Sequence, residues 1–390
     1  MKVRYAVKNE KNIAFNHWRN SFKDSEQQIE FYFNNIFSHK NYLILEKDKK
    51  VVSSLHENPY ILNFNSNEIK TKYIVGVSTP IEEQRKGYMK TLMREMLKKS
   101  SKEMPFIFLT PINPHIYRRF GFEYFSKIES YHFSIENLSK FNTVKDISFI
   151  EIDLSNKDEY INDLIKIYNN SMKGNFFCYL KRDKYYFSKL LCECLNEEMK
   201  IFISFVNKVP KAYVIFSKYD NKIDIRECFA LECDEYNNIL GLLYGYRDYY
   251  NEINLFSAEG MNLEFLFKNQ MNITKKETPF MMLRILKPLE VLNFSEVNIE
   301  NLKIYIEDNI LEYNTGMYVF INGKWEILKN AEDYDFKIDV ADLVPLLTGF
   351  FTFDELLFMK KIVLKTNKKN KIKQLSSLFK RRKSYLYEFQ

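Results

Sequence analysis

The stretch QRKGYMKTLMREML, residues 84–97, places a glycine between a polar, basic tripeptide and a run of helical character. The chain holds only 10 glycines in 390 residues, well below the usual share of roughly 7%, so each glycine position is informative. The apolar residues of the run recur at helical spacing, which predicts a helix with one apolar face; they are Met89, Leu92, Met93, Met96 and Leu97. Because the first N–H groups of a helix are unpaired and partly positive, a glycine turn that enters a helix is a candidate anion site.

The segments on either side of this turn are typical of strands. KTKYIVGVST (70–79) precedes it and PFIFLT (105–110) follows the helix. A strand, a turn, a helix and a second strand form one crossover, which predicts that the two strands are adjacent and parallel. Upstream, residues 41–62 are typical of two further strands, and residues 12–22 and 27–37 have apolar residues at helical spacing.

Two further blocks of mixed character follow. The second, about 146–272, loosely repeats the first block without its glycine turn; its expected elements are helices at 160–170, 185–195 and 237–250 and strands at 200–206, 211–217, 222–231 and 252–258. The third begins at PFMMLRI (279–285), continues as strands with Asn-Thr-Gly and Asn-Gly turns through residue 328, and ends in helical segments. We therefore expect an α/β (α+β) chain of several domains, with mixed sheets flanked by helices.

Charge and cysteine content narrow the classes of function. The formal net charge is +7, and nine Lys or Arg without an acid lie between Lys365 and Lys383, so the remaining 49 basic and 51 acidic residues nearly balance. This tract predicts an exposed stretch or a charged helix face, and because it lacks interleaved aromatics we expect no nucleic-acid partner. Five cysteines without a paired C-x-x-C arrangement predict reduced thiols and no metal site. Cys192 and Cys194, two apart in a helical stretch, are expected to be core or neutral.

The chain also lacks the patterns of a membrane or secreted protein. Its first residues, MKVRYAVKNEKN, contain no apolar signal core, and its longest apolar run, LVPLLTGFF at 343–351, is far too short to span a bilayer. We expect a cytoplasmic protein without a membrane partner.

The glycine turn at Gly87 matches neither common nucleotide motif. G-x-x-x-x-G-K-[ST] and G-x-G-x-x-G are both absent around it. The turn suits a pyrophosphate, with Gly87 allowing close approach of the backbone and Arg85 and Lys86 adding charge. On spacing alone, an ordinary strand-to-helix turn is the alternative.

The residues around the turn carry a resemblance. YIVGVSTPIEEQRKGYMKTLM (73–93) resembles the acyl-CoA loop of the GNAT N-acetyltransferases, whose [QR]-x-x-G-x-[GA] motif is met by Gln84 and Gly87 and departed from at Met89. LTPINPHIYRRFGFEYF (109–125) is similar to the family segment that carries a tyrosine and then F-G-F. A bulky residue at 89 followed by I-Y-x-x-F-G-[FY] resembles the Eis-like (enhanced intracellular survival) acetyltransferases.

The resemblance covers essentially the whole chain and implies three domains. These are an N-terminal catalytic GNAT domain at 1–145, a second, degenerate GNAT-like domain at 146–278, and a domain like sterol carrier protein at 279–390. It also implies a homo-oligomer, with the hexamer as the family's typical form.

The same resemblance assigns roles toward acetyl-CoA, the co-substrate that it implies. Backbone groups of Val77, Ser78 and Thr79 would face the pantetheine and thioester, and Tyr117 would be the general acid. A phenol suits this task because its unperturbed pKa of about 10 is near that of a leaving thiol; a core or surface aromatic is the alternative. The pyrophosphate would be held by Arg85, Lys86, Gly87, Tyr88, Met89 and Lys90, with a further CoA contact from Asn113.

The base and the acceptor pocket are less closely matched. In the family a C-terminal carboxylate acts as base, but here the tail YLYEFQ (385–390) ends with the extra residue Gln390, so the carboxylate would be displaced. The alternative is a water chain oriented by Glu388. Asp24 matches an acidic position of the family's substrate pocket, unless it is a helix N-cap. His115 is a proton-relay candidate, with a surface histidine as the alternative.

Taken together, these residues predict an acetyl-CoA-dependent N-acetyltransferase without a metal cofactor. The acceptor would be a primary amine on an aminoglycoside-like polycation or a lysine side chain. The alternative from another class is a catalytically lapsed GNAT scaffold that binds CoA, or an apolar ligand through its sterol-carrier-like domain.

Overall fold

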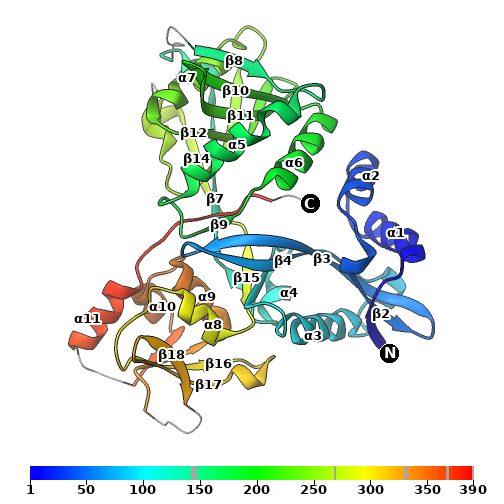
Figure 1. Ribbon diagram of the computed structural model, residues 1–390, viewed down its shortest axis with the longest axis vertical. Coiled ribbons are helices and arrows are strands. Elements are labelled where there is room, and N and C mark those ends of the chain that lie inside the picture. Colours follow the sequence, from blue (N-terminus) through cyan, green and yellow to red (C-terminus); the bar gives the residue numbers. More distant parts are fainter. Residues whose placement is uncertain (142–146, 268, 329–332, 366–368, 389–390) are drawn as a thin grey trace. The chain divides into compact units, whose positions relative to one another are not determined.

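The computed structural model describes residues 1–141, 147–267, 269–328, 333–365 and 369–388. Its helices and strands fall into two compact units, one formed by residues 1–126 together with 280–390 and the other by residues 127–279 (Figure 1). The predicted mixed α/β architecture is confirmed. In the described part of the chain, no helix combines the length and the apolar character that crossing a membrane requires.

The first unit is built on a sheet in which one neighbouring pair is parallel. Along the sheet the order is β1 (Lys2–Tyr5), β2 (Tyr42–Lys47), β3 (Lys50–Phe64), β4 (Asn67–Ser78), β5 (Phe106–Leu109), β15 (Met282–Ile285) and β6 (Glu123–Tyr124). β4 and β5 pair in parallel, with Tyr73 opposite Phe108, so the predicted crossover is confirmed. The other neighbours on this path pair antiparallel.

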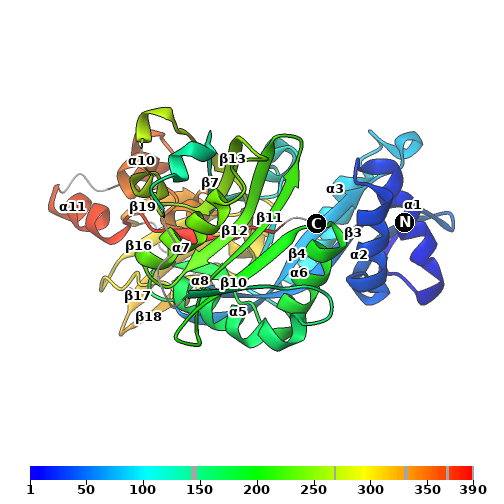
Figure 2. The same cartoon turned by 90° about the horizontal axis from the view of Figure 1, so that it is seen from above.

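Helices cover both faces of this sheet. Those of the N-terminal part are α1 (Lys11–Ser21), α2 (Glu26–Asn35), α3 (Tyr88–Ser100) and α4 (Pro114–Arg118), with 3-10 turns η1 (Lys8–Glu10), η2 (His39–Asn41) and η3 (Ile81–Glu83). α1 and α2 lie side by side (Figure 2), with the rings of Phe15 and Phe33 5.2 Å apart. The buried side of α3 joins Leu43, Ile74 and Ile107 in one core cluster.

The remainder of the first unit has a second, smaller sheet. Its strand order is β18 (Lys324–Leu328), β17 (Gly316–Ile321), β16 (Lys303–Glu307), β19 (Phe336–Asp339) and β20 (Ile362–Leu364), with β16 and β19 parallel. The basic tract contains α11 (Lys369–Leu378), in which Lys371 forms a 3.4 Å ion pair with Asp335. The other elements are α8 (Pro288–Phe294), η7 (Glu312–Asn314), α9 (Val340–Thr348), α10 (Phe353–Phe358), α11 (Lys369–Leu378) and β21 (Ser384–Tyr385).

A buried ion pair joins the two parts of this unit. Arg284 of β15 is fully buried, and its Nη2 donates to both carboxylate oxygens of Asp308 at 2.7 Å. Gly121 lies against the guanidinium, since a Cβ at that position would come within 2.9 Å of it. The glycine of the F-G-F motif therefore makes room for this arginine.

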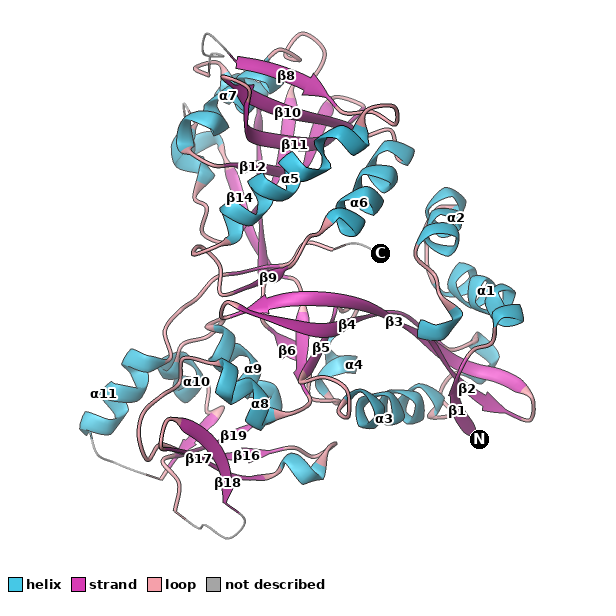
Figure 3. Cartoon of the chain, viewed as in Figure 1, coloured by secondary structure: helices cyan, strands magenta, loops and turns pink. Residues whose placement is uncertain are grey.

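The second unit repeats the topology of the first sheet. Seven strands follow the order β14 (Thr274–Pro279), β7 (Lys127–Ser134), β13 (Glu252–Ala258), β12 (Lys222–Ala230), β11 (Val209–Tyr219), β10 (Lys200–Val206) and β8 (Ile147–Glu151). β12 and β13 are parallel, like β4 and β5. α5 (Lys157–Met172) packs against β11 and β12 (Figure 3). The other elements are η4 (Ile135–Leu138), α5 (Lys157–Met172), β9 (Cys178–Leu180), α6 (Lys184–Asn196), α7 (Cys233–Tyr244), η5 (Leu263–Leu266) and η6 (Gln270–Asn272).

The helix that follows β12 begins differently from α3. Its N-cap is Glu232, and its first turn contains Asp234 and Glu235. Three acids at a helix N-terminus use its partial positive charge and repel a phosphate. The second unit therefore lacks, at this turn, the anion site that α3 offers.

The compact units change at 126/127 and 279/280. β7 belongs to the second sheet and β15 to the first, whereas the expected domain boundaries lie at 145/146 and 278/279. The division into three domains stays a prediction.

Candidate functional site

The site begins with an irregularity in β4. Ser54 of β3 lies opposite Ser78 of β4 and His56 lies opposite Val75, so two steps on β3 match three on β4. This extra residue is a β-bulge, and it reverses which face the following side chains point to. Beyond the bulge, Val77 packs on the α3 side, while Ser78 hydrogen-bonds to Ser54 on the other face.

Gly76 forms the bulge. Its φ is +60°, and a Cβ would lie 2.7 Å from the ring of Trp18 and 3.0 Å from that of His56. Only glycine meets both the left-handed backbone and the close packing of α1.

β4 extends beyond the end of its parallel neighbour β5, which ends at Leu109. Their described parallel pairing is Tyr73 with Phe108, yet β4 continues to Ser78. A strand that extends past its neighbour leaves backbone groups on that side without a partner strand, although the carbonyls of Ser78 and Thr79 accept hydrogen bonds from Ser53 and Gln84. The predicted contact residues Val77, Ser78 and Thr79 lie at this opening.

The loop after β4 leads directly to the N-terminus of α3. Gln84 fixes it, because its Nε2 donates to the carbonyl of Thr79 at 3.2 Å. Arg85 has a φ of +62° and the N-cap Gly87 a φ of +82°. Gly87 has no side chain to occupy the first N–H groups of the helix, so they face outward. This is the arrangement that binds anions.

The residues predicted to hold the pyrophosphate are not equivalent. Lys86 forms a 2.9 Å ion pair with Glu83, whereas Arg85 is exposed. Tyr88 points inward, is 7% exposed, and its hydroxyl accepts a hydrogen bond from Lys47 at 2.9 Å. Only the backbone of Tyr88 can therefore face an anion.

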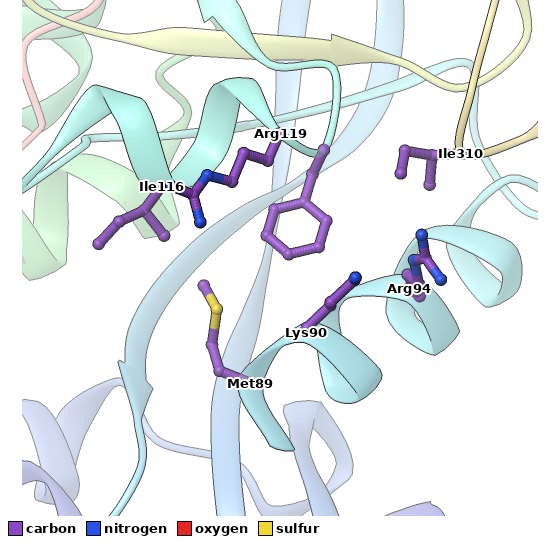
Figure 4. Close-up of a pocket in the computed structure, with 7 residues that line it drawn as sticks. Met89, Lys90, Arg94, Ile116, Arg119 and Ile310 are labelled. Carbon is purple, nitrogen blue, oxygen red and sulfur yellow. The ribbon is translucent and has the colours of Figure 1, made fainter. Parts of the chain in front are cut away.

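A pocket of about 270 Å³ opens between α3 and α4. Figure 4 shows Met89 and Lys90 from α3 facing Ile116 of α4 and Arg119, the residue that follows α4. Its described lining has three cations and no acid, beside four apolar side chains. The residues are Met89, Lys90, Arg94, Ile116, Arg119, Phe120 and Ile310. A ligand with both an anionic and an apolar part would suit it.

Tyr117 lies in α4, next to this pocket. It is 8% exposed, and burial raises its pKa to about 12. Burial raises the pKa of Tyr73, and the charges of Glu388 and of an ionised Tyr117 raise it further. Asn113 is the N-cap of α4, with its Oδ1 accepting from the backbone N–H of His115 at 3.1 Å. His115 itself is exposed.

The C-terminal tail reaches the same region. Glu388 is 5% exposed; its carboxylate accepts from the hydroxyl of Tyr60 and its carbonyl from that of Tyr73, both at 3.4 Å. The Tyr73 hydroxyl also lies 2.8 Å from Oγ1 of Thr110. The structure thus places Glu388 near Tyr117 through Tyr73. Gln390 lies outside the described residues.

Asp24, in the segment between α1 and α2, has a hydrogen-bond partner. Its Oδ2 accepts from the indole N–H of Trp18 at 2.7 Å. The interpretation of Asp24 as a helix N-cap is wrong, because Ser25 caps α2 and Gln28 completes a capping box. A neighbouring histidine, His56, is buried among aromatic rings, and burial lowers its pKa to about 3. His56 is therefore neutral and a poor base.

Several residues of this region were not predicted from the sequence. Arg94 and Arg119 line the pocket, and Tyr73 joins the tail to Tyr117. For Arg94 a signal existed, since it lies four residues after Lys90 and so on the same helix face. For Tyr73, one of 27 tyrosines, no sequence pattern indicated such a role.

Two family models match the chain. The model of the acetyltransferase (GNAT) domain matches residues 2–125, and the model of the sterol carrier protein domain matches residues 286–387. No curated protein matches the sequence.

Solved structures resemble the fold over the full length. A GCN5-related N-acetyltransferase from Anabaena variabilis superposes with a TM-score of 0.84 at 18% identity, covering 100% of both chains. A probable N-acyltransferase from Enterococcus faecalis gives 0.85 at 18%, covering 100% of this chain and 99% of that one. Eis1 from Mycobacterium abscessus gives 0.79 at 14%, covering 100% of both. The predicted resemblance to Eis-like GNAT proteins is confirmed.

Proposed function

We propose, from the match of residues 2–125 to the acetyltransferase (GNAT) domain model, that the chain transfers the acetyl group of acetyl-CoA to a primary amine. One juxtaposition carries the proposal. The bulged, open end of β4 meets the glycine-capped N-terminus of α3, and the buried Tyr117 lies beside the cationic pocket between α3 and α4.

The residues fit acetyl-CoA, which carries phosphates at one end and a thioester at the other. The first turn of α3 contains Lys90 and no acid, so its N–H groups are open to a pyrophosphate. Lys90, Arg94 and Arg119 add charge in the adjoining pocket. Val77, Ser78 and Thr79 would face the thioester end.

Each protein group has a role that its surroundings support. When bound, acetyl-CoA supplies the activated acyl group. A backbone N–H freed by the bulge would donate to the carbonyl oxygen as negative charge develops on it. Tyr117, protonated because burial raises its pKa, would give its proton to the leaving sulfur. Asn113 would contribute a further CoA contact through groups other than its capping oxygen.

The acceptor would enter from the α1 side, where Asp24 lies exposed. A carboxylate there favours a cationic amine, such as a small polycation or a lysine side chain. Glu388 would help to orient it, and the terminal carboxylate of Gln390 or a water chain would take its proton. We further propose a cytoplasmic homo-oligomer, hexameric as the resemblance implies; gel filtration with light scattering that gives only monomer would reject this.

The test is release of free thiol from acetyl-CoA with a panel of amines that includes aminoglycosides, polyamines and lysine peptides. We expect turnover with at least one cationic amine and an acetylated product by mass spectrometry. Binding of acetyl-CoA without turnover of any amine would reject the enzyme and favour the catalytically lapsed scaffold.

A further inference from the structure

Three polar side chains connect the end of β4 with α1. Ser78 Oγ lies 2.9 Å from Ser54 Oγ, and Ser54 Oγ lies 2.9 Å from Nδ1 of His17. Both serines are fully buried or nearly so, at 4% and 0% exposed, whereas His17 is partly exposed. These hydrogen bonds thus connect a buried hydroxyl beside the bulge with a titratable ring that can exchange protons with water.

The β-bulge brings these three side chains into hydrogen-bonding contact. Without the extra residue, alternation would turn Ser78 to the α3 side and away from Ser54. α1 lies directly over the bulge, since Trp18, the neighbour of His17, packs against Gly76. The feature that opens β4 for the thioester therefore also directs a hydroxyl toward the face where the acceptor would enter.

We propose that His17, Ser54 and Ser78 form a relay that removes a proton from the acceptor amine. The inference rests on the proposed acetyl transfer and names a base within the described residues, in place of the terminal carboxylate or water chain. An N–H proton of the amine passes to Ser78 Oγ, the hydroxyl proton of Ser78 to Ser54, and that of Ser54 to Nδ1 of His17. The amine keeps the electron pair that bonds to the acetyl carbon. His17 becomes an imidazolium, and after product release the Nδ1 proton passes to water, which returns the ring to its starting tautomer with the proton on Nε2. Both serines keep one proton each.

The surroundings of His17 hold it in the accepting form. Burial lowers its pKa below the usual 6.5, Glu82 of η3 acts in the opposite direction, and Lys50 of β3 acts with burial. Glu82 and Lys50 pair at 3.2 Å, which limits the effect of each. His56, the other histidine coupled to His17, stays neutral. Its Nδ1 lies 2.9 Å from the hydroxyl of Tyr32, outside the relay.

The kinetic test compares His17→Gln and Ser54→Ala with His39→Gln, a partly exposed histidine of η2 that is not a member of the relay. In the wild type, kcat at saturating amine should fall as the pH drops through the pKa of His17, below 6.5, because the imidazolium cannot accept a proton. His17→Gln and Ser54→Ala should each lower kcat about 10- to 100-fold and abolish this acidic limb. His39→Gln should keep both the rate and the limb.

The relay also makes a prediction that is independent of turnover. At pH 7 the imidazole of His17 must carry its proton on Nε2 and leave Nδ1 bare to accept from Ser54, a tautomer that ¹⁵N NMR of labelled histidine identifies. A proton on Nδ1 would overturn the relay, as would an acidic limb that persists in His17→Gln while the wild type acetylates amines. If the wild type acetylates no amine, the proposed function itself fails, and the relay with it.

Discussion

Two independent features of the structure require glycine at position 76. Its φ of +60° is a left-handed conformation, and a Cβ would press on Trp18 and His56. Gly87 shares the first constraint, with a φ of +82°, but among the described residues nothing lies within 4 Å of a Cβ there. A comparison of substitutions at the two glycines therefore distinguishes the cost of backbone strain from the cost of overpacking.

Gly76→Ala should lower the free energy of unfolding by about 2–4 kcal/mol, since left-handed strain and overpacking add. Gly87→Ala should cost about 1 kcal/mol. Urea denaturation followed by fluorescence measures both. The chain has two tryptophans, so a Trp325→Phe background leaves Trp18, which touches Gly76, as the reporter. Equal losses at the two glycines would show that packing against Trp18 contributes nothing.

Tyr117 gives a prediction about pH. A general acid must be protonated, and burial raises the pKa of this phenol to about 12. The phenol therefore stays in its active form from pH 7 to 10, and kcat should show no fall from Tyr117 over that range. Tyr117→Phe removes the proton at every pH and should lower kcat about 10²- to 10³-fold.

The matched control for that change is Tyr124→Phe. Tyr124 follows in the same segment, but its ring stacks on Phe350, 6.3 Å between centroids. The Tyr124→Phe variant should keep kcat within about twofold of the wild-type value. Initial rates of thiol release at saturating acetyl-CoA decide between them, and an unchanged rate in Tyr117→Phe would reject the phenol as the acid.

Helices and strands whose formation depends on neighbouring residues were predicted from the local sequence pattern. The apolar period of residues 89–97 predicted α3, and the strand-turn-helix-strand order predicted the parallel pair β4 and β5. The bulge could not be predicted in this way, because it exists only in the register of β4 against β3. For the same reason no pattern linked His17 with Ser54 and Ser78, which come from three separate elements.

The N-terminus of α3 offers a test of anion binding within one helix. Lys90→Glu puts an acid in the first turn, against the partial positive charge and in the lining of the cationic pocket. We expect CoA to bind about 5- to 10-fold more weakly, which corresponds to about 1–1.4 kcal/mol. The difference should shrink with added salt, since the pocket is open to solvent.

Lys98→Glu is the control, because it makes the same charge change in the last turn of α3, where Lys98 pairs with Glu95 at 3.1 Å. Isothermal titration with CoA measures both variants. If Lys98→Glu weakens binding as much as Lys90→Glu, net charge rather than the helix N-terminus attracts the ligand.

At the scale of the whole chain, distant segments complete the first unit. β15 inserts between β5 and β6 although Met282 lies over 170 residues after its partner Leu109. Single-sequence patterns carry no information on such pairing, so PFMMLRI was predicted to be a strand but assigned to the third domain. The C-terminal tail is a similar case, since only the resemblance indicated that it reaches the N-terminal site.

The tail should contribute to stability as well as to the site. Leu386 and Tyr387 are 2% and 5% exposed, and the ring of Tyr387 lies 5.7 Å from that of Phe280. A chain that ends at Tyr385 loses both side chains, and its first unit should unfold with about 3–5 kcal/mol less free energy. It also loses the Glu388 carbonyl that accepts from Tyr73, so amine acetylation should fall with it.

Two full-length comparisons separate these effects. Glu388→Gln keeps the buried volume and the carbonyl but removes the charge that Tyr60 contacts, so its stability should stay close to wild type. If its kcat falls while stability holds, the carboxylate acts on the acceptor; if kcat also holds, the tail is structural. Deleting Gln390 alone leaves the residues up to Glu388 in place: a lower kcat would put the end of the chain in the site, and a higher one would mean that the extra residue obstructs a base supplied by Phe389.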